Sequence, residues 1–95
     1  MKRNRIQLYM DILGSIEKSK KGVTKIMYSS NANITTAKKY LRVAIRRGHA
    51  STEGVGKRTH YAITDNGLDF LSEWKQYKKF AEELESSVGN NNEEA

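Results

Sequence analysis

The sequence predicts an α+β fold that is mostly helical, with three short helices, a two-stranded hairpin and a long last helix. Two observations support this prediction. Apolar residues recur at spacings of three and four in three separate segments, which is the period of an amphipathic helix. Between the second and the last of these segments the period shortens to two around a glycine turn, which indicates a β-hairpin. With 95 residues the chain is expected to form one small domain.

The first two helices are expected to be short. Asn4 is the predicted N-cap of the first helix, and Thr24 is the predicted N-cap of the second. Their apolar residues are Ile6, Tyr9, Leu13 and Ile16 in the first helix and Ile26, Met27 and Tyr28 in the second. A basic loop at residues 18–22 separates them, and the polar residues 30–33 predict a tight corner before the third helix.

The third helix is predicted at residues 34–47. Asn33 can accept a hydrogen bond from its first turn, and Gly48 can end it in a left-handed conformation. Its apolar face holds Ile34, Ala37, Leu41, Ala44 and Ile45, and its outer face holds Thr35, Thr36, Lys39, Arg42, Val43 and Arg46. No Asp or Glu lies between Glu17 and Glu53, so the cations of the outer face repel one another unless something anionic lies against them. A phosphate backbone is the simplest such partner.

A β-hairpin is predicted after the third helix. Its strands are expected at residues 49–53 and 59–64, around the turn formed by residues 54–56. Lys57 and Arg58 then lie just past the tip, where the hairpin would reach a nucleic-acid backbone beside the third helix. A solvated loop is the plainer interpretation of the same two cations.

The last helix is predicted to be long and to begin after an N-cap at Thr64 or Asp65. If it covers residues 67–88, its 22 residues span roughly 33 Å, more than a domain of this size can cover. Its apolar residues follow a heptad pattern. They are Phe70, Trp74, Tyr77, Ala81, Leu84 and Val88, with Phe80 widening the stripe. The stripe predicts a coiled coil with a second copy, and the alternative is that it folds back onto its own domain.

Charge is distributed unevenly along the chain. Residues 1–60 contain 14 Lys or Arg and 3 Asp or Glu, a net charge of +11, whereas residues 61–95 contain 3 and 8, a net charge of −5. The basic first part predicts a nucleic-acid-binding surface, and the acidic last part predicts a different role. The alternative is a surface that is charged only for solubility.

Several classes of protein are not expected. The chain has no Cys, which removes disulfides, thiolate chemistry and Cys-based zinc sites. Its N-terminus meets a charge before any long apolar run, so neither a signal peptide nor a membrane span is expected, and we expect a cytoplasmic, nucleoid-associated protein. Because no glycine-rich phosphate loop and no nucleophile beside a base is found, we expect neither an enzyme nor a cofactor or small-molecule substrate. His49 and His60 have only Glu53 near them in sequence, too few ligands for a metal site.

A helix, a helix-turn-helix, a hairpin and a final helix in this order describe a winged helix. Four short segments fit a known pattern of this kind. They are Thr24-Lys25-Ile26-Met27-Tyr28 with Asn33, Lys39-Tyr40-Leu41, Tyr61-Ala62-Ile63-Thr64, and Gly67 with Phe70-Leu71. On these segments, residues 6–88 resemble the archaeal winged-helix DNA-binding proteins with a C-terminal antiparallel coiled-coil dimerisation helix, the Sulfolobus ten-kilodalton "a" chromatin-protein family and related predicted transcriptional regulators. The resemblance implies binding of DNA by the third helix in the major groove and by the wing.

The side chains of the third helix and the wing suit double-stranded DNA. The predicted DNA-binding residues are Thr35, Thr36, Lys38, Lys39, Tyr40, Arg42, Val43, Arg46, Lys57 and Arg58. Hydroxyl groups can meet phosphates or base edges, and the cations are better suited to phosphates, although Arg42 or Arg46 could instead bind guanine. Val43 could touch thymine methyl groups or pack against the wing, and Tyr40 could cover the core edge or reach a phosphate.

A second copy of the chain is the expected cover of the last helix. The predicted dimerisation residues are Phe70, Trp74, Tyr77, Phe80, Ala81, Leu84 and Val88. Antiparallel pairing is favoured by the resemblance and because parallel pairing would bring two basic regions together. Residues 4–66 are then the winged helix-turn-helix domain, residues 67–88 the dimerisation helix and residues 89–95 a disordered tail.

The sequence therefore predicts a homodimeric double-stranded-DNA-binding protein, either a transcriptional regulator or a nucleoid-type architectural protein. The alternative is a winged helix that serves as a protein-interaction or RNA-binding module. The outer face of the third helix favours DNA, because interaction modules expose apolar or mixed-charge surface, whereas this face is cationic.

Overall fold

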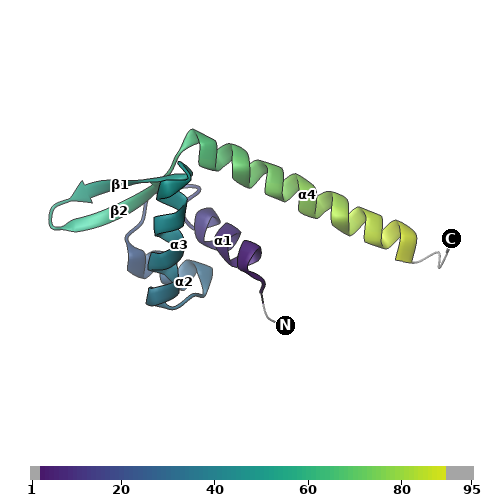
Figure 1. The fold of residues 1–95 in the computed structure, drawn as a ribbon, viewed down its shortest axis with the longest axis horizontal. Coiled ribbons are helices and arrows are strands. Elements are labelled where there is room, and N and C mark those ends of the chain that lie inside the picture. Colours follow the sequence, from purple (N-terminus) through teal and green to yellow (C-terminus); the bar gives the residue numbers. More distant parts are fainter. Residues whose placement is uncertain (1–2, 90–95) are drawn as a thin grey trace.

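Four helices and one hairpin make up the structure, a computed structural model that describes residues 3–89 (Figure 1). In chain order the elements are α1 (Arg5–Gly14), α2 (Val23–Ser30), α3 (Ile34–Arg46), β1 (Ala50–Val55), β2 (Arg58–Ile63) and α4 (Asp65–Gly89). This order confirms the predicted fold class. Gly89 still belongs to α4, and residues 90–95, for which disorder is predicted, lie outside the described residues.

The core lies between α1, α2, α3 and the first turns of α4. Its buried residues are Tyr9, Met10, Ile12, Leu13, Ile16, Ile26, Leu41, Ala44, Ala50 and Leu71. Asn4 caps α1 as predicted, in a capping box with Gln7 that satisfies two backbone N–H groups of the first turn. The helix ends at Gly14, earlier than predicted, so that Ile16 reaches the core from the loop that follows.

The helix-turn-helix pair α2 and α3 differs from the prediction at its first end. Thr24 as the N-cap is wrong: Gly22 has the extended cap conformation, and its carbonyl accepts the N–H of Ile26 at 3.2 Å. Asn33 caps α3 as predicted, accepting the N–H of Thr36 at 2.8 Å. The helix ends at Arg46, one residue earlier than predicted.

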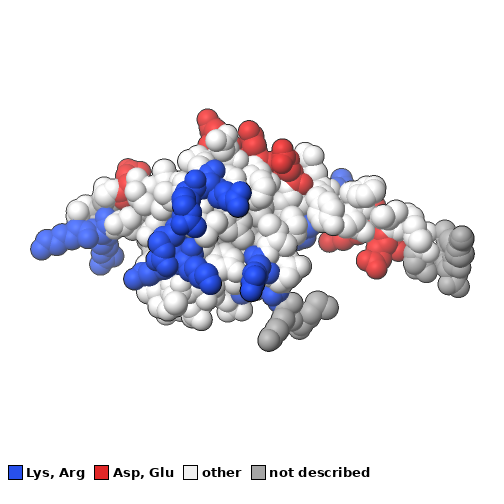
Figure 2. Space-filling view, in the orientation of Figure 1, with Lys and Arg blue, Asp and Glu red and all other residues white. Residues whose placement is uncertain are grey.

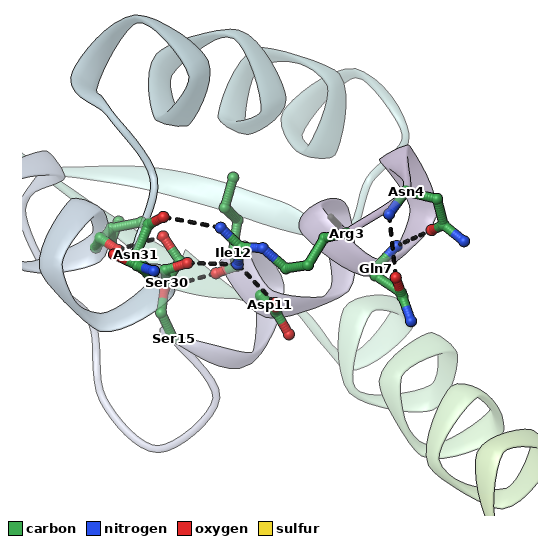
Figure 3. A network of polar contacts seen from close by, with 9 residues as sticks. Arg3, Asn4, Gln7, Asp11, Ile12, Ser15, Ser30 and Asn31 are labelled. Carbon is green, nitrogen blue, oxygen red and sulfur yellow. Dashed lines mark hydrogen bonds and ion pairs between the residues drawn. The ribbon is translucent and has the colours of Figure 1, made fainter. Parts of the chain in front are cut away.

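The corner between α2 and α3 is held by Arg3 (Figure 3). Asn31 ends α2 in the left-handed region, with φ at 56°. The guanidinium of Arg3 donates to the carbonyls of Ser30 at 2.6 Å and Asn31 at 2.8 Å, and to the carboxylate of Asp11 at 2.7 Å. A cation at these carbonyls satisfies acceptors that the end of a helix leaves free, so residues before α1 stabilise the corner that orients α3.

The hairpin pairs β1 with β2 from Ala50 opposite Ile63 to Val55 opposite Arg58. The predicted turn at residues 54–56 is wrong, because this register leaves Gly56 and Lys57 as the two-residue loop. Gly56 has φ at 63°, which a glycine adopts without steric cost. His60 lies opposite Glu53.

The loop between α1 and α2 joins the hairpin to the helices. Lys21 and Tyr61 exchange two backbone hydrogen bonds, of 3.1 and 2.8 Å, so that the loop is joined to β2 by an isolated β-bridge. The hairpin is therefore fixed at its base, while its far end projects away from the helices (Figure 1).

Helix α4 begins against the winged helix and then leaves it (Figure 1). Thr64 caps it, accepting the N–H of Gly67 at 3.0 Å and donating to the carbonyl of Gly48 at 2.5 Å. Phe70, Leu71 and Trp74 pack in or against the core. The 25 residues of α4 span about 37 Å, and the molecule measures 59 × 27 × 20 Å. None of the helices within residues 3–89 is long and apolar enough to cross a membrane.

Candidate nucleic-acid interface

The exposed face of α3 is cationic from Lys38 to Arg46. Its exposed polar side chains are Thr35, Lys38, Lys39, Arg42 and Arg46, and Thr36 is half-buried. Figure 2 shows Lys and Arg side chains gathered over α3, whereas Asp and Glu lie mainly along α4. The three ion pairs found within residues 3–89 are Arg3–Asp11, Lys20–Glu53 and Lys75–Glu17. None of them neutralises a cation of α3.

Two of the predicted DNA-binding residues lie at the edge of this face. Tyr40 and Val43 are half-buried and pack against the core. The ring of Tyr40 is tilted against that of Tyr9, with centroids 6.3 Å apart. Their remaining exposed surface borders the cationic face, so each contributes to the position of α3 as well as to its surface.

The apolar face of α3 is rotated from the predicted one. Ala37, Leu41 and Ala44 are buried as predicted, but Ile45 is 38% exposed and Ile34 is 43% exposed. The reason lies in the neighbours, because Tyr9 of α1 packs on the Tyr40 side and draws that side inward. The two Ile side chains therefore lie in solvent beside the cations.

The hairpin carries two more predicted cations at its free end. Lys57 is in the two-residue loop and Arg58 is the first residue of β2, and both are exposed. Figure 2 shows cationic side chains at this end of the hairpin, apart from those over α3. The structure thus presents two separate cationic surfaces on one domain.

A groove connects the helix-turn-helix to the wing. It is lined by the loop before α2, the start of α2, Lys38 of α3, and residues 58–61 of β2, so that Lys38 and Arg58 face one groove. Lys20 also lines it but donates to the carboxylate of Glu53 at 2.8 Å. That hydrogen bond holds the pKa of Glu53 below its ordinary value. Lys20 is thereby partly neutralised, and the groove keeps its charge through other cations.

Two residues of α2 were missed in the sequence. Lys25 lines the same groove, and Tyr28 is 76% exposed. Their spacing of three places them on one side of a helix, and this signal was available. The sequence interpretation counted Tyr28 only among the apolar residues of the second helix, with Ile26 and Met27.

An aromatic cluster fixes the end of α3 to α1 and α4. The hydroxyl of Tyr9 and Nδ1 of His49 are hydrogen-bonded at 2.7 Å, and the ring of His49 stacks on Phe70 with centroids 4.4 Å apart. Burial raises the pKa of Tyr9. Burial, and to a lesser degree the charge of Arg47, lowers the pKa of His49, so the imidazole is neutral at pH 7.

The far part of α4 exposes the rest of the apolar stripe. Tyr77, Phe80, Leu84 and Val88 are 49 to 61% exposed, and Ala81 is half-buried. The alternative that the whole stripe folds back is wrong for these residues, while Phe70 and Trp74 do contact their own domain. No three potential metal ligands come together within residues 3–89.

A wing beside a helix-turn-helix, with an exposed cationic helix in the second position of that pair, defines the winged-helix fold of DNA-binding proteins. Residues 2–82 match the family described as Winged helix-turn-helix, and the chain belongs to that family. The search of curated protein sequences found no match.

Solved structures of similar fold include DNA-binding proteins and regulators. Sso10a-2, a DNA-binding protein from Sulfolobus solfataricus, is 26% identical over 93% of this chain and 92% of its own, with a TM-score of 0.82. A PadR family transcription regulator from Clostridium difficile is 17% identical over 85% and 96%, with a TM-score of 0.77. The homodimeric DNA-binding domain of Mb0332 from Mycobacterium bovis, a possible ArsR-family regulator, is 19% identical over 76% and 68%, with a TM-score of 0.67. The first of these confirms the resemblance to the archaeal family, and the other two show the fold.

Proposed function

We propose that this chain is a homodimeric double-stranded-DNA-binding protein, a transcriptional regulator or a nucleoid-type architectural protein. The observation that supports this most directly is the unneutralised cationic face of α3 beside a cationic wing. An α-helix fits the major groove of B-DNA, and cations along its exposed face can replace the counterions condensed on the two phosphate backbones. Such a protein would be found on nucleoid DNA in the cytoplasm.

The side chains of α3 divide into two groups in this proposal. Thr35 and Lys39 lie in the first half of the helix, whose exposed side would enter the groove and meet base edges. Arg42 and Arg46 lie further along the same face and would bind phosphates. The hydroxyl of Tyr40 and the methyl groups of Val43 would add contacts at the edge, where both side chains are partly exposed.

The wing and its groove would bind the backbone beside the helix. Lys57 and Arg58 would contact phosphates past one edge of the major groove, while Lys38 faces the groove that runs from α3 to β2. Because these side chains offer charge without fixed geometry toward a base, they would contribute affinity more than sequence preference.

The far part of α4 would join two copies. Residues 4–66 would form the DNA-binding domain and residues 67–88 the dimerisation helix, with the first turns of that helix shared between the two roles. A large apolar stripe exposed on one helix is typical of an interaction surface. Sso10a-2 is similar over 93% of the chain, which supports a common architecture.

Duplex binding should depend steeply on salt. If about six phosphates are neutralised, the slope of log K against log salt should be near −5. The measurement is fluorescence anisotropy of a labelled random duplex at several salt concentrations. Binding that is absent at low salt, or that does not respond to salt, would contradict the proposal, and binding of RNA but not duplex DNA would favour the alternative module.

Single cations then test the interface. Arg42→Ala should weaken duplex binding about tenfold, because a hydrogen bond to a charged group contributes roughly 1.5 kcal/mol or more, and should reduce the salt slope by about one. The matched control is Lys79→Ala, which removes an exposed cation of α4. Equal losses in the two variants would mean that only the net charge matters.

Selection from a pool of random duplexes distinguishes a transcriptional regulator from an architectural protein, since a regulator enriches a sequence motif and an architectural protein does not.

A further inference from the structure

The corner between α2 and α3 is short and tightly bonded. It consists of residues 31–33. The N–H of Ala32 donates back to the carbonyl of Met27 at 3.0 Å and closes the last turn of α2 around Asn31, which lies in the left-handed region. Two carbonyls at the end of that turn, those of Ser30 and Asn31, accept hydrogen bonds from outside the helix pair.

Arg3 supplies both of these hydrogen bonds (Figure 3). Its Nη1 lies 2.6 Å from the carbonyl oxygen of Ser30, and its Nη2 lies 2.8 Å from that of Asn31. A guanidinium is planar and holds its donors in a fixed fork, so it restricts the backbone angles of Asn31, which relate the two carbonyls. Nη1 also donates to the carboxylate of Asp11 in α1, at 2.7 Å. One side chain therefore ties the corner to α1.

The direction of α3 depends on this corner. The helix has 13 residues and spans about 20 Å, so a tilt of about 10° at its start displaces its far end by about 3 Å. Hydrogen bonds to a base or a phosphate are lost over a smaller distance, since donor and acceptor must lie within about 2.7–3.2 Å of each other. Two of the three buried side chains of α3 are Ala37 and Ala44, and such small side chains restrain a tilt less than branched ones do.

The charge of Arg3 is already engaged within the chain. Its acceptors include the carboxylate of Asp11, and its side chain is 33% exposed. Arg5, two residues later, is exposed and takes part in none of the ion pairs found within residues 3–89. Arg3 thus differs from the cations of the proposed interface, which no carboxylate of α1 holds in place.

We propose that Arg3 is a positioning residue for duplex binding. It fixes the corner so that the first half of α3 is directed into the major groove, and it makes no contact with a phosphate. This rests on the proposed function and deepens it, because it assigns a role in DNA binding to a residue that lies before α1, outside both the helix-turn-helix and the wing. Loss of Arg3 therefore lowers affinity through the direction of α3 and not through charge.

Helix orientation in the free chain gives the first test. Residual dipolar couplings of the backbone amides measure the angle between α3 and α1. Arg3→Lys keeps the charge but loses the fork of donors, so α3 should turn by about 5° or more relative to α1. The matched control is Arg5→Lys, the same chemical change two residues later, which should leave the angle unchanged. An unchanged angle in Arg3→Lys would overturn the proposal.

Duplex binding gives the second test. Arg3→Lys should weaken binding of a labelled duplex about fivefold at constant net charge, while Arg5→Lys should bind as the wild type does. In a double-mutant cycle with Arg42→Ala, the effect of Arg3→Lys should shrink, because a misdirected α3 has already lost the contact of Arg42. Wild-type affinity in Arg3→Lys, or additive effects of the two substitutions, would mean that Arg3 does not act through α3 and would overturn the proposal.

The two tests separate this proposal from the proposed function. A wild-type chain that does not bind duplex DNA at low salt contradicts the proposed function, whereas binding by the wild type with an unchanged angle in Arg3→Lys contradicts only the role of Arg3. If Arg3→Lys unfolds the corner altogether, Asp11→Asn repeats the first test, since it loosens the guanidinium from α1 and leaves Arg3 in place. It should turn α3 in the same sense by a smaller angle, and an unchanged angle would overturn the proposal.

Discussion

One apolar stripe runs along α4, and it is packed against the domain at the start of the helix but exposed in the far part. In the first turns, Leu71 is buried, and Phe70 and Trp74 pack against the winged helix. From Tyr77 onward the same stripe is exposed, and α4 extends away from its own domain (Figure 1). The heptad spacing is continuous across this boundary, so the spacing itself does not mark where the cover changes.

The difference shows what an apolar period can and cannot establish. A repeat of three and four residues indicates that one side of a helix is apolar and is more stable when it is buried, because burial of aromatic rings is favourable. It does not say whether the cover comes from the same chain. The elongated shape answers this question for the single chain. A radius of gyration of 16.1 Å exceeds the roughly 12 Å expected for a compact domain of this length, so the chain does not fold back over the far part of its own stripe.

The largest predicted effect contrasts one Leu from each region. Leu41→Ala should lower the free energy of unfolding by about 2–5 kcal/mol, because Leu41 is fully buried and its removal leaves a cavity. Leu84→Ala should change the stability of the single chain little and weaken self-association instead. Thermal unfolding at several protein concentrations measures both effects.

Concentration dependence separates the two variants. The melting temperature of the wild type should rise with protein concentration, because dimerisation stabilises only the folded chain. Leu41→Ala should melt lower at every concentration, and Leu84→Ala should lose most of the concentration dependence. The same loss of stability in both variants, at every concentration, would mean that the far part of α4 is covered by its own domain.

The next effect concerns the anchor of α4. A Cβ at Gly67 would overlap the carbonyl oxygen of His49 and approach Cγ1 of Ile63 to 2.7 Å. Gly67→Ala should therefore destabilise the fold by about 1–3 kcal/mol, although Ala favours a helix over Gly by about 1 kcal/mol. Urea unfolding measures the change. Ser72→Ala, at an exposed position of the same helix, is the control and should be neutral or slightly stabilising; a stabilised Gly67→Ala would contradict the close packing at the anchor.

Most of the fold could be predicted because local signals agreed with one another. Asn4 and Asn33 cap their helices as predicted, and Gly48 follows α3 with φ at 77°. The errors fall where two local solutions have similar energies. Thr24 and Gly22 are both acceptable N-caps in sequence. Residues 54–57 offer two possible glycine turns, and only the pairing of β1 with β2 selects one of these two turns.

The candidate site was predicted less completely because it depends on tertiary contacts. The cations of α3 follow from its period, but the groove that brings Lys25 and Lys38 to Arg58 arises from three separate elements. The half-burial of Val43 and the exposure of Ile45 depend on where α1 lies, which helical spacing does not contain. The sequence therefore predicted the charge of the surface, whereas the shape of the surface depends on the tertiary fold.

The smallest predicted effect is a pH dependence confined to the anchored region. Because burial lowers the pKa of His49 in the folded chain, the unfolded chain takes up a proton first as the pH falls through about 6.5. The share of stability that comes from His49 is thus complete above about pH 6.5 and is lost as the pH falls toward the folded pKa. An NMR titration of the His49 ring should show a midpoint below 6.5, and Arg47→Ala should raise it only partly, since burial is the larger cause.

The far part of α4 supplies the contrast, since the chain's two histidines, His49 and His60, both lie before it. Self-association should therefore stay constant between about pH 7.5 and 5.5, while the free energy of unfolding of the winged helix declines. His49→Gln isolates the share of His49, because its stability should fall less than that of the wild type over the same range. A wild-type dimer that dissociates in this range would show that the two ends of α4 are not separated as the burial pattern indicates. A His49→Gln variant that keeps the full pH dependence would show that His49 is not the source of that dependence.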